Sequence, residues 1–276
     1  MGHQALQRVS MRMLYDPRFA EQVYADPSAT LASVDITETE RQWLLDVDPR
    51  AWTVDSQRGQ RCLRNLFGEF RGSTTLALAQ TRSLSGLQAF FQSPHFHQQV
   101  QQRGSLARGY ARFLGELTED PLVAEVARLE WMQAQCRREL ELCPRLDSLA
   151  PKAIARAPGI GAGRFDGATL DALNAAEQAL FQLQLIPAAG LCDDAPRPSP
   201  VAPRPDQPLD LIARPIDGQI QLVQLGSMAS RTLALLGSPH TQEAAVARVT
   251  SLGLSAQRGA ALLGGLLGEG LLILGS

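Results

Sequence analysis

Residues 120–139 read DPLVAEVARLEWMQAQCRRE and carry two apolar faces at helical spacing. One face recurs at steps of three and four residues, which is the period of an α-helix. Its members are Leu122, Val126, Leu129, Met132, Cys136 and Leu140. The second face combines Trp131 with the small side chains of Ala124, Ala127 and Ala134, which let a neighbouring helix approach closely. The pattern predicts a helix over 120–142 that is covered on two sides, as in the middle of a bundle.

The chain before this segment predicts shorter helices with short connections. Thr37 and Glu40 have the spacing of a capping box, in which each side chain bonds the backbone of the other residue. Ser93 followed by Pro94 is a typical helix start, since serine caps the first turn and proline fits its first position. Further helices are expected over 4–15, 57–70 and 105–117.

After residue 150 the pattern changes toward strands. Leu180–Ile186 alternates apolar and glutamine side chains, which predicts a strand with one buried face. Residues 209–216 and 219–225 flank Asp217-Gly218, a pair typical of a two-residue hairpin turn. The region therefore predicts a small sheet that contains a hairpin.

The end of the chain adds helices to this sheet. Helices are expected over 227–236, 241–252 and 255–267, followed by a short strand over 271–274. Gly253 and Gly268 fall where helix-ending glycines are expected. We therefore predict an α+β protein with a mainly helical region over 1–150. Residues 151–276 are expected to form a winged-helix-like module of the peptide-recognition type, with the Pro-rich residues 193–208 as an exposed loop.

The composition argues against several classes of protein. The 276 residues include 26 basic and 28 acidic side chains, and this near balance argues against a chain dominated by nucleic-acid or membrane-surface binding. No apolar run approaches the ~18 residues of a membrane span, and the N-terminus lacks a signal-peptide pattern. The cysteines, Cys62, Cys136, Cys143 and Cys192, form no C-x-x-C pair, which indicates reduced thiols in a cytoplasmic protein.

Patterns typical of catalysis or metal binding are scarce. His95 and His97 are two residues apart, so on a helix their side chains point in different directions and suit the surface better than one metal ion. Gly159–Gly163 reads GIGAG, but no strand is expected before it and no complete phosphate-binding motif follows. We therefore expect no catalytic residue and no metal ligand in this chain.

A winged-helix-like module can also bind DNA, so a transcriptional regulator with a helical sensor domain is the alternative function. From residue 207 to the end, four acidic residues balance four arginines. The last expected helix has Arg258 as its one basic residue. A helix that reads DNA needs several cations and polar side chains, so this balance argues against it. An enzyme acting by itself is a further alternative.

Peptide binding is the expectation that fits the hairpin best, because an exposed strand edge accepts an extended peptide as an added strand. The expected peptide-binding residues are Gln219, Ile220, Gln221, Leu222 and Val223. The strand expected over 180–186 is a second candidate for the docking edge. The alternative without a binding role is an ordinary edge strand that the Pro-rich loop covers.

Several apolar segments carry a family resemblance. They are LYDPRFAEQVYADP (14–27), WLLDVDPRAW (43–52), FFQSPHFHQQV (90–100), LARGYARFLGEL (106–117) and DPLVAEVARLEWMQAQCRRE (120–139), with RLEW (128–131) the most specific part. Together they resemble the partner proteins of multinuclear non-heme iron-dependent oxidative enzymes in peptide natural-product biosynthesis. This family includes the MbnC-type proteins of methanobactin biosynthesis and the TglI-type protein of the 3-thiaglutamate pathway.

The resemblance implies a heterodimer with a TIM-barrel enzyme that holds the irons and oxidises a cysteine of a ribosomal precursor peptide. This chain would be the non-catalytic subunit that recognises the leader peptide, without a cofactor of its own. Phe91, His95 and Arg138 are the candidates for partner contacts, because they lie on or beside the resembling segments and off the clearest core stripes. Arg138 also shares one charged side of the expected helix with Glu130, Arg137 and Glu141, and the alternative role of that side is a solvated or ion-paired surface.

Overall fold

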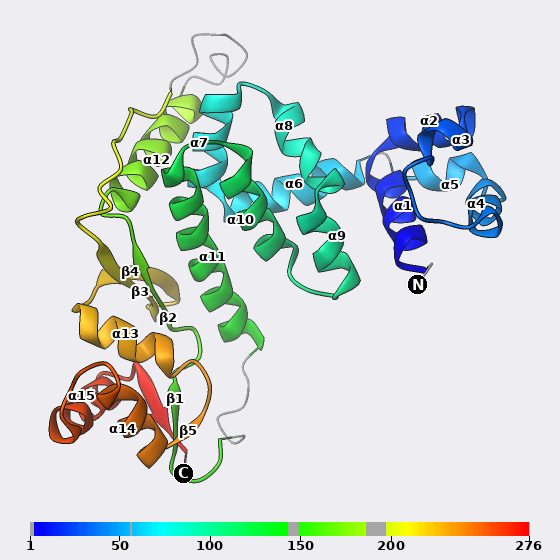
Figure 1. The fold of residues 1–276 in the computed structure, drawn as a ribbon. Helices are drawn as coiled ribbons and strands as arrows, with labels where there is room; N and C mark the ends of the chain where they lie inside the picture. Colours follow the sequence, from blue (N-terminus) through cyan, green and yellow to red (C-terminus); the bar gives the residue numbers. More distant parts are fainter. Residues whose placement is uncertain (1–2, 56, 143–148, 186–196, 276) are drawn as a thin grey trace. The chain divides into compact units, whose positions relative to one another are not determined.

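The computed structural model of the chain describes residues 3–55, 57–142, 149–185 and 197–275 (Figure 1). Helices and small antiparallel sheets make it an α+β protein, as the sequence predicts. The chain forms two compact units: unit 1 comprises residues 1–127 and 176–198, and unit 2 comprises residues 128–175 and 199–276. This division differs from the expected boundary at residue 150, because helices α11 (Pro121–Leu142) and α12 (Thr169–Leu185) each contribute residues to both units.

Unit 1 is built from helices. Before α11 they are α1 (His3–Tyr15), α2 (Pro17–Ala25), α3 (Pro27–Thr30), α4 (Glu38–Leu45), α5 (Pro49–Thr53), α6 (Arg58–Glu69), α7 (Arg71–Thr81), α8 (Leu84–Gln88), the 3-10 helix η1 (Ala89–Gln92), α9 (Pro94–Gln101) and α10 (Leu106–Leu117). Helices α2, α3, α5 and α9 share one start signal: Asp16, Asp26, Asp48 or Ser93 accepts a first-turn backbone N–H, and proline follows. The Asp-Pro pairs in the resembling segments therefore begin helices.

The predicted capping box at the start of α4 is confirmed. The Glu40 backbone N–H donates to the Thr37 hydroxyl at 3.2 Å, and the Glu40 carboxylate accepts the Thr37 N–H at 2.8 Å. Further along unit 1, Phe90 is fully buried and packs edge-to-face against Phe96 and Tyr110, with ring centroids 5.4 and 5.2 Å away. Aromatic packing thus joins η1, α9 and α10.

Unit 2 holds two antiparallel sheets within its described residues. Its strands are β1 (Ala153–Arg156), β2 (Gly161–Phe165), β3 (Leu209–Ile216), β4 (Gln219–Gln224), β5 (His240–Thr241) and β6 (Leu272–Leu274). One sheet has the order β5-β1-β6 and the other the order β2-β3-β4. Helix α13 (Ser227–Leu235) packs on β2 and β3, whereas α14 (Gln242–Thr250) and α15 (Ala256–Gly268) pack with the first sheet. The expected C-terminal helices and the last strand are confirmed.

The sheet β2-β3-β4 has a helix on each face. Gly161 and Gly163 of β2 face α11, because a Cβ atom at Gly161 would lie 2.5 Å from Cγ of Met132. Ala162 points the opposite way and packs, with Ile212, in the apolar cluster that also contains Leu233 of α13. The glycines therefore allow α11 to lie close against the strand, and the GIGAG run is a packing motif.

Two expectations about strands are wrong. Residues 180–185 are not a strand but the last turns of α12, because the local alternation continues a longer run of Ala, Leu and Gln, which favour helix. Phe181 is 61% exposed there, and residue 186 lies outside the described residues. The expectation that no strand precedes Gly159 is also wrong, since β1 ends at Arg156.

Smaller corrections concern helix faces and ends. On α11 the apolar stripe stops before Leu140, which is 38% exposed, and Glu130 is 4% exposed and so does not belong to a solvated side. Gly253 has the expected positive φ of 93°, but the residue with positive φ after α15 is Gly270 (68°) and not Gly268.

Candidate functional site

Strand β4 is an edge strand, and it carries the five residues expected to bind a peptide. Its turn is confirmed: Asp217 and Gly218 both have positive φ, 50° and 76°, as a type I′ hairpin requires. The Cα register pairs Gln221 with Arg214 and Val223 with Ile212. One step further, the Leu225 N–H donates to the Asp210 carbonyl at 3.0 Å.

This register decides which backbone groups of β4 face outward. In an antiparallel ladder, residues that bond the partner strand alternate with residues whose N–H and C=O point away. Because Leu225 bonds β3, the backbones of Val223, Gln221 and Gln219 do so too. The outward N–H and C=O groups therefore belong to Ile220, Leu222 and Gln224.

The side chains of β4 divide between the two faces of the sheet. Val223 and Leu225 pack against the apolar cluster of unit 2 that includes Leu233. Ile220 and Leu222 are half-buried on the other face, and the glutamines at 219, 221 and 224 are exposed. The expected residues thus lie together on one strand, but only Ile220 and Leu222 of the five point their backbone groups outward.

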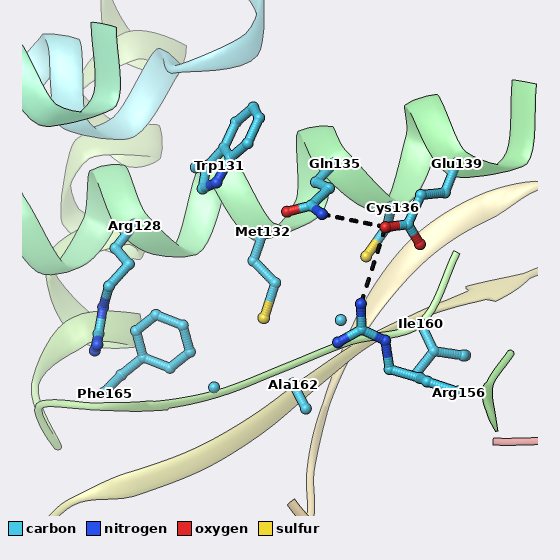
Figure 2. Close-up of a pocket in the computed structure, with 12 residues that line it drawn as sticks. Arg128, Trp131, Met132, Gln135, Cys136, Glu139, Arg156, Ile160, Ala162 and Phe165 are labelled. Carbon is cyan, nitrogen blue, oxygen red and sulfur yellow. Dashed lines mark hydrogen bonds and ion pairs between the residues drawn. The ribbon is translucent and has the colours of Figure 1, made fainter. Parts of the chain in front are cut away.

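The opposite edge of the same sheet is partly occupied. Arg128 of α11 donates from its guanidinium to the carbonyl of Arg164 on β2, and its charge lies 4.5 Å from the centre of the Phe165 ring (Figure 2). This arginine begins the RLEW motif. Because Arg128 already bonds the Arg164 carbonyl, this acceptor on the β2 edge is not available to an added strand. The edge of β4 is therefore more accessible for strand addition.

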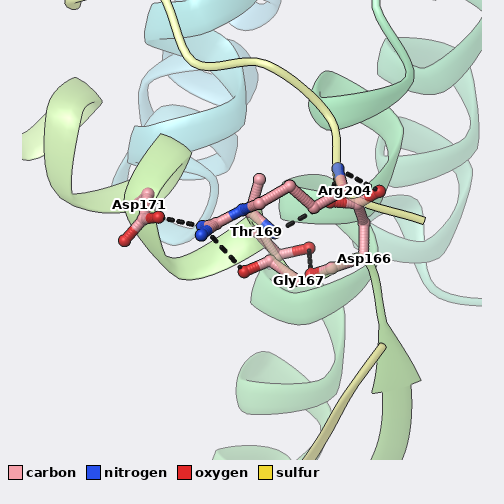
Figure 3. A network of polar contacts seen from close by, with 6 residues as sticks. Asp166, Gly167, Thr169, Asp171 and Arg204 are labelled. Atoms are coloured by element: carbon pink, nitrogen blue, oxygen red, sulfur yellow. Dashed lines mark hydrogen bonds and ion pairs between the residues drawn. The ribbon is translucent and has the colours of Figure 1, made fainter. Parts of the chain in front are cut away.

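The described part of the Pro-rich loop, residues 197–208, is anchored at the start of α12 (Figure 3). The Asp166 carboxylate accepts the backbone N–H groups of Ala168 and Arg204, each at 2.8 Å. The Arg204 guanidinium donates to the Gly167 carbonyl at 3.0 Å and to the Asp171 carboxylate. Residues 193–196 of this loop lie outside the described residues.

The expected partner contacts are in three different environments. Phe91 is a core residue: it is 4% exposed and stacks on Tyr15 at 4.8 Å, so the expectation that it lies off the core is wrong. His95 lies 2.8 Å from the Glu116 carboxylate and is mostly buried. Arg138 is half-buried and lies 5.7 Å from the Trp131 ring. Arg138 belongs to unit 2 and the other two to unit 1.

Two thiols and one histidine have environments that alter their pKa values. Burial, with the nearby Glu139 charge, raises the pKa of Cys136 to about 11, and burial also raises the pKa of Cys62. Burial and then the charges of Arg8 and Arg12 lower the pKa of His97. Cys143 and Cys192 lie outside the described residues.

The described residues offer neither a clustered metal site nor a membrane-spanning helix. They contain no cluster of three or more His, Cys, Asp or Glu side chains positioned to hold a metal ion. No helix among them combines the length and apolar character needed to cross a membrane.

Comparison with known proteins does not identify the chain. A scan against models of protein families gives no match, and a search of curated proteins finds no relative.

Proposed function

We propose that this protein is the non-catalytic subunit of a peptide-modifying iron oxidase and that β4 binds the leader part of the precursor peptide. The observation that carries the proposal is the outer edge of β4, where Ile220, Leu222 and Gln224 direct their backbone groups away from β3 and no other strand of the described residues pairs with them. A peptide added along this edge gains backbone hydrogen bonds at every second residue. The exposed glutamines beside it add donors and acceptors without presenting an apolar surface that aggregates.

The order of the helices and strands in unit 2 supports a peptide-recognition module of the winged-helix type. Helix α13, strand β5, helices α14 and α15 and strand β6 follow one another, and β1 completes their sheet as its central strand. In this proposal the helices provide a rigid support, and the hairpin β3-β4 extends from it as the docking strand pair.

The proposed enzyme partner rests on the family resemblance of the helical segments. Within that assignment the iron and the oxygen-dependent cysteine chemistry belong to the TIM-barrel subunit. This chain contributes peptide binding and an interface. His95 and Arg138 remain proposed partner contacts, since both side chains are partly exposed. Phe91 is buried in the core of unit 1 and is not proposed as a direct contact.

Co-expression with an iron protein from the same operon tests the proposal. The two chains are expected to purify as one complex, with the iron in the partner and with the labelled precursor peptide bound more tightly by the complex than by the enzyme alone. Separate elution of the two chains at low salt contradicts the partner assignment. Salt-sensitive retention on DNA by this chain alone would favour the regulator instead.

A further inference from the structure

A cavity of about 240 Å³ lies beside β2 and α11 within unit 2 (Figure 2). One end of it, the charged end, carries Arg156, Glu139 and Gln135, with Ile160 beside them. From there the apolar lining runs along Met132 to Phe165, whose ring lies 4.5 Å from the Arg128 guanidinium at the other end. This arrangement differs from the exposed edge of β4, and it belongs to neither the peptide nor the partner proposal.

At the charged end two opposite charges lie side by side without a direct hydrogen bond between them. Arg156 Nη2 lies 3.9 Å from Glu139 Oε1, which is longer than a hydrogen bond. Glu139 is held in place by its neighbours: its carboxylate accepts the Gln135 side-chain amide at 3.2 Å and the Gly159 backbone N–H at 3.2 Å. The side chains of Arg156 and Glu139 are 19% and 31% exposed, so both charges are partly shielded from water.

The backbone of β2 adds a donor and an acceptor to the cavity lining. The pairs Gly161–Ala213 and Gly163–Leu211 bond β2 to β3, because the alternate residues of β3 bond β4. Ala162 therefore directs its N–H and C=O away from β3, at a residue that lines the cavity. A small ligand with both a cationic and an anionic group finds complementary partners here.

We propose that this cavity binds a free α-amino acid with an apolar side chain. The ligand carboxylate lies against Arg156 and its ammonium group against Glu139, so the ligand bridges two charges that are too far apart for a direct hydrogen bond. The ligand side chain extends along Met132 toward Phe165. A simple anion would face Glu139 and a simple cation would face Arg156, whereas a zwitterion satisfies both charges. The volume restricts the ligand to a single amino acid of moderate size.

Calorimetric titration of the full chain tests the proposal with defined probes. L-methionine, L-leucine and L-phenylalanine are compared with 4-methylpentanoate, which lacks the ammonium group, and with isoamylamine, which lacks the carboxylate. At least one amino acid is expected to bind at least about tenfold more tightly than both single-charge analogues. No binding of the three amino acids up to about 10 mM contradicts the proposal, because that concentration corresponds to a negligible affinity.

Matched variants locate the site. Arg156→Gln and Glu139→Gln are each expected to weaken amino-acid binding by at least about tenfold. Arg137→Gln and Glu141→Gln make the same chemical changes at exposed residues of α11 outside the cavity and are expected to leave binding unchanged. Melting curves first establish that each variant is folded, and either cavity variant suffices if the other unfolds. Equal binding by a folded cavity variant and its control would place the amino acid elsewhere and overturn the proposal.

Discussion

The backbone N–H of Leu225 donates to the carbonyl oxygen of Asp210 at 3.0 Å, one step beyond the last residue of β4. This bond fixes the alternation along the whole strand. Gln219, Gln221 and Val223 use their backbone groups inside the hairpin, and the residues between them point outward. A test of strand addition must therefore change an outward residue.

Proline at an inward position of β4 is expected to unfold the hairpin. Val223→Pro removes the donor that bonds β3 opposite Ile212, and the Val223 side chain packs in the core of unit 2. We expect a loss of cooperative unfolding for this module, measured by urea denaturation. Gln221→Pro is expected to act in the same direction opposite Arg214. Native-like stability of both variants would show that the register is different.

The hairpin turn favours glycine at residue 218 because of its positive φ and not because a side chain would clash. A Cβ atom at Gly218 meets nothing within 4 Å, but its φ is 76°, so Gly218→Ala is expected to destabilise the protein by about 1–2 kcal/mol. Gly264→Ala on α15 is the matched control. It also meets nothing within 4 Å, and because it lies inside a helix we expect stabilisation by about 0.5–1 kcal/mol. Urea midpoints that move in the same direction would contradict this reading.

The Asp166 carboxylate is expected to matter more for stability than the ion pair beside it. It accepts two backbone N–H groups, from Ala168 and Arg204, so Asp166→Ala leaves donors without their partner and is expected to cost about 1–3 kcal/mol. Asp171→Asn removes only an exposed charge pair with Arg204 and is expected to cost less than about 1 kcal/mol. Chemical denaturation of the two variants checks the order, and a reversed order would contradict the anchoring role of Asp166.

Cys136 gives the protein a pH dependence on the alkaline side. The folded state holds the pKa of Cys136 at about 11, above the usual value of 9.0, so the folded protein keeps this proton longer than the unfolded chain. The contribution to stability is complete below about pH 9 and is lost as the pH rises toward 11. Cys136→Ala is expected to reduce this decline in the urea midpoint. An unchanged pH profile in the variant would show that other groups cause the decline.

His97 gives the stability of the protein a pH dependence on the acid side. Its folded pKa lies below the usual 6.5, so the unfolded chain binds a proton more readily, and stability falls as the pH drops below 6.5. His97→Gln is expected to flatten the stability profile between about pH 6.5 and 5. His95→Gln is the comparison, since His95 lies beside the Glu116 carboxylate. A profile that only His95→Gln flattens would contradict the assignment.

Local signals in the sequence predicted much of this fold because they act through neighbouring residues. The capping box at Thr37 and Glu40, the Ser93-Pro94 start and the Asp217-Gly218 turn need only residues a few positions apart. Residues 180–185 form helix where the sequence predicts a strand, because five or six alternating residues fit both a strand and part of a helix. Local patterns do not predict β1, because it is a strand through its pairing with the distant β5 and β6. They do not predict the role of the β2 glycines either, because that role depends on the close approach of α11.

The candidate site was predicted in part. The strand that carries Gln219–Val223 and its hairpin partner follow from the sequence, but the division between inward and outward backbone groups requires the register. The cavity at Arg156 and Glu139 joins residues from β1 and α11, and no local pattern predicts this pair. The burial of Phe91 likewise depends on contacts with Tyr15 and Phe96, which lie in other helices.

Proline at an outward residue of β4 tests the central claim most directly. Leu222→Pro removes one outward donor while the bonds to β3 are kept, and Leu222→Ala controls for the lost side chain. Binding of the labelled precursor peptide is measured by fluorescence anisotropy after melting curves establish the fold. Ile220→Pro replaces Leu222→Pro if the latter unfolds. We predict that the folded proline variant binds the peptide at least about tenfold more weakly than the alanine variant. A folded proline variant with wild-type affinity would contradict strand addition at β4.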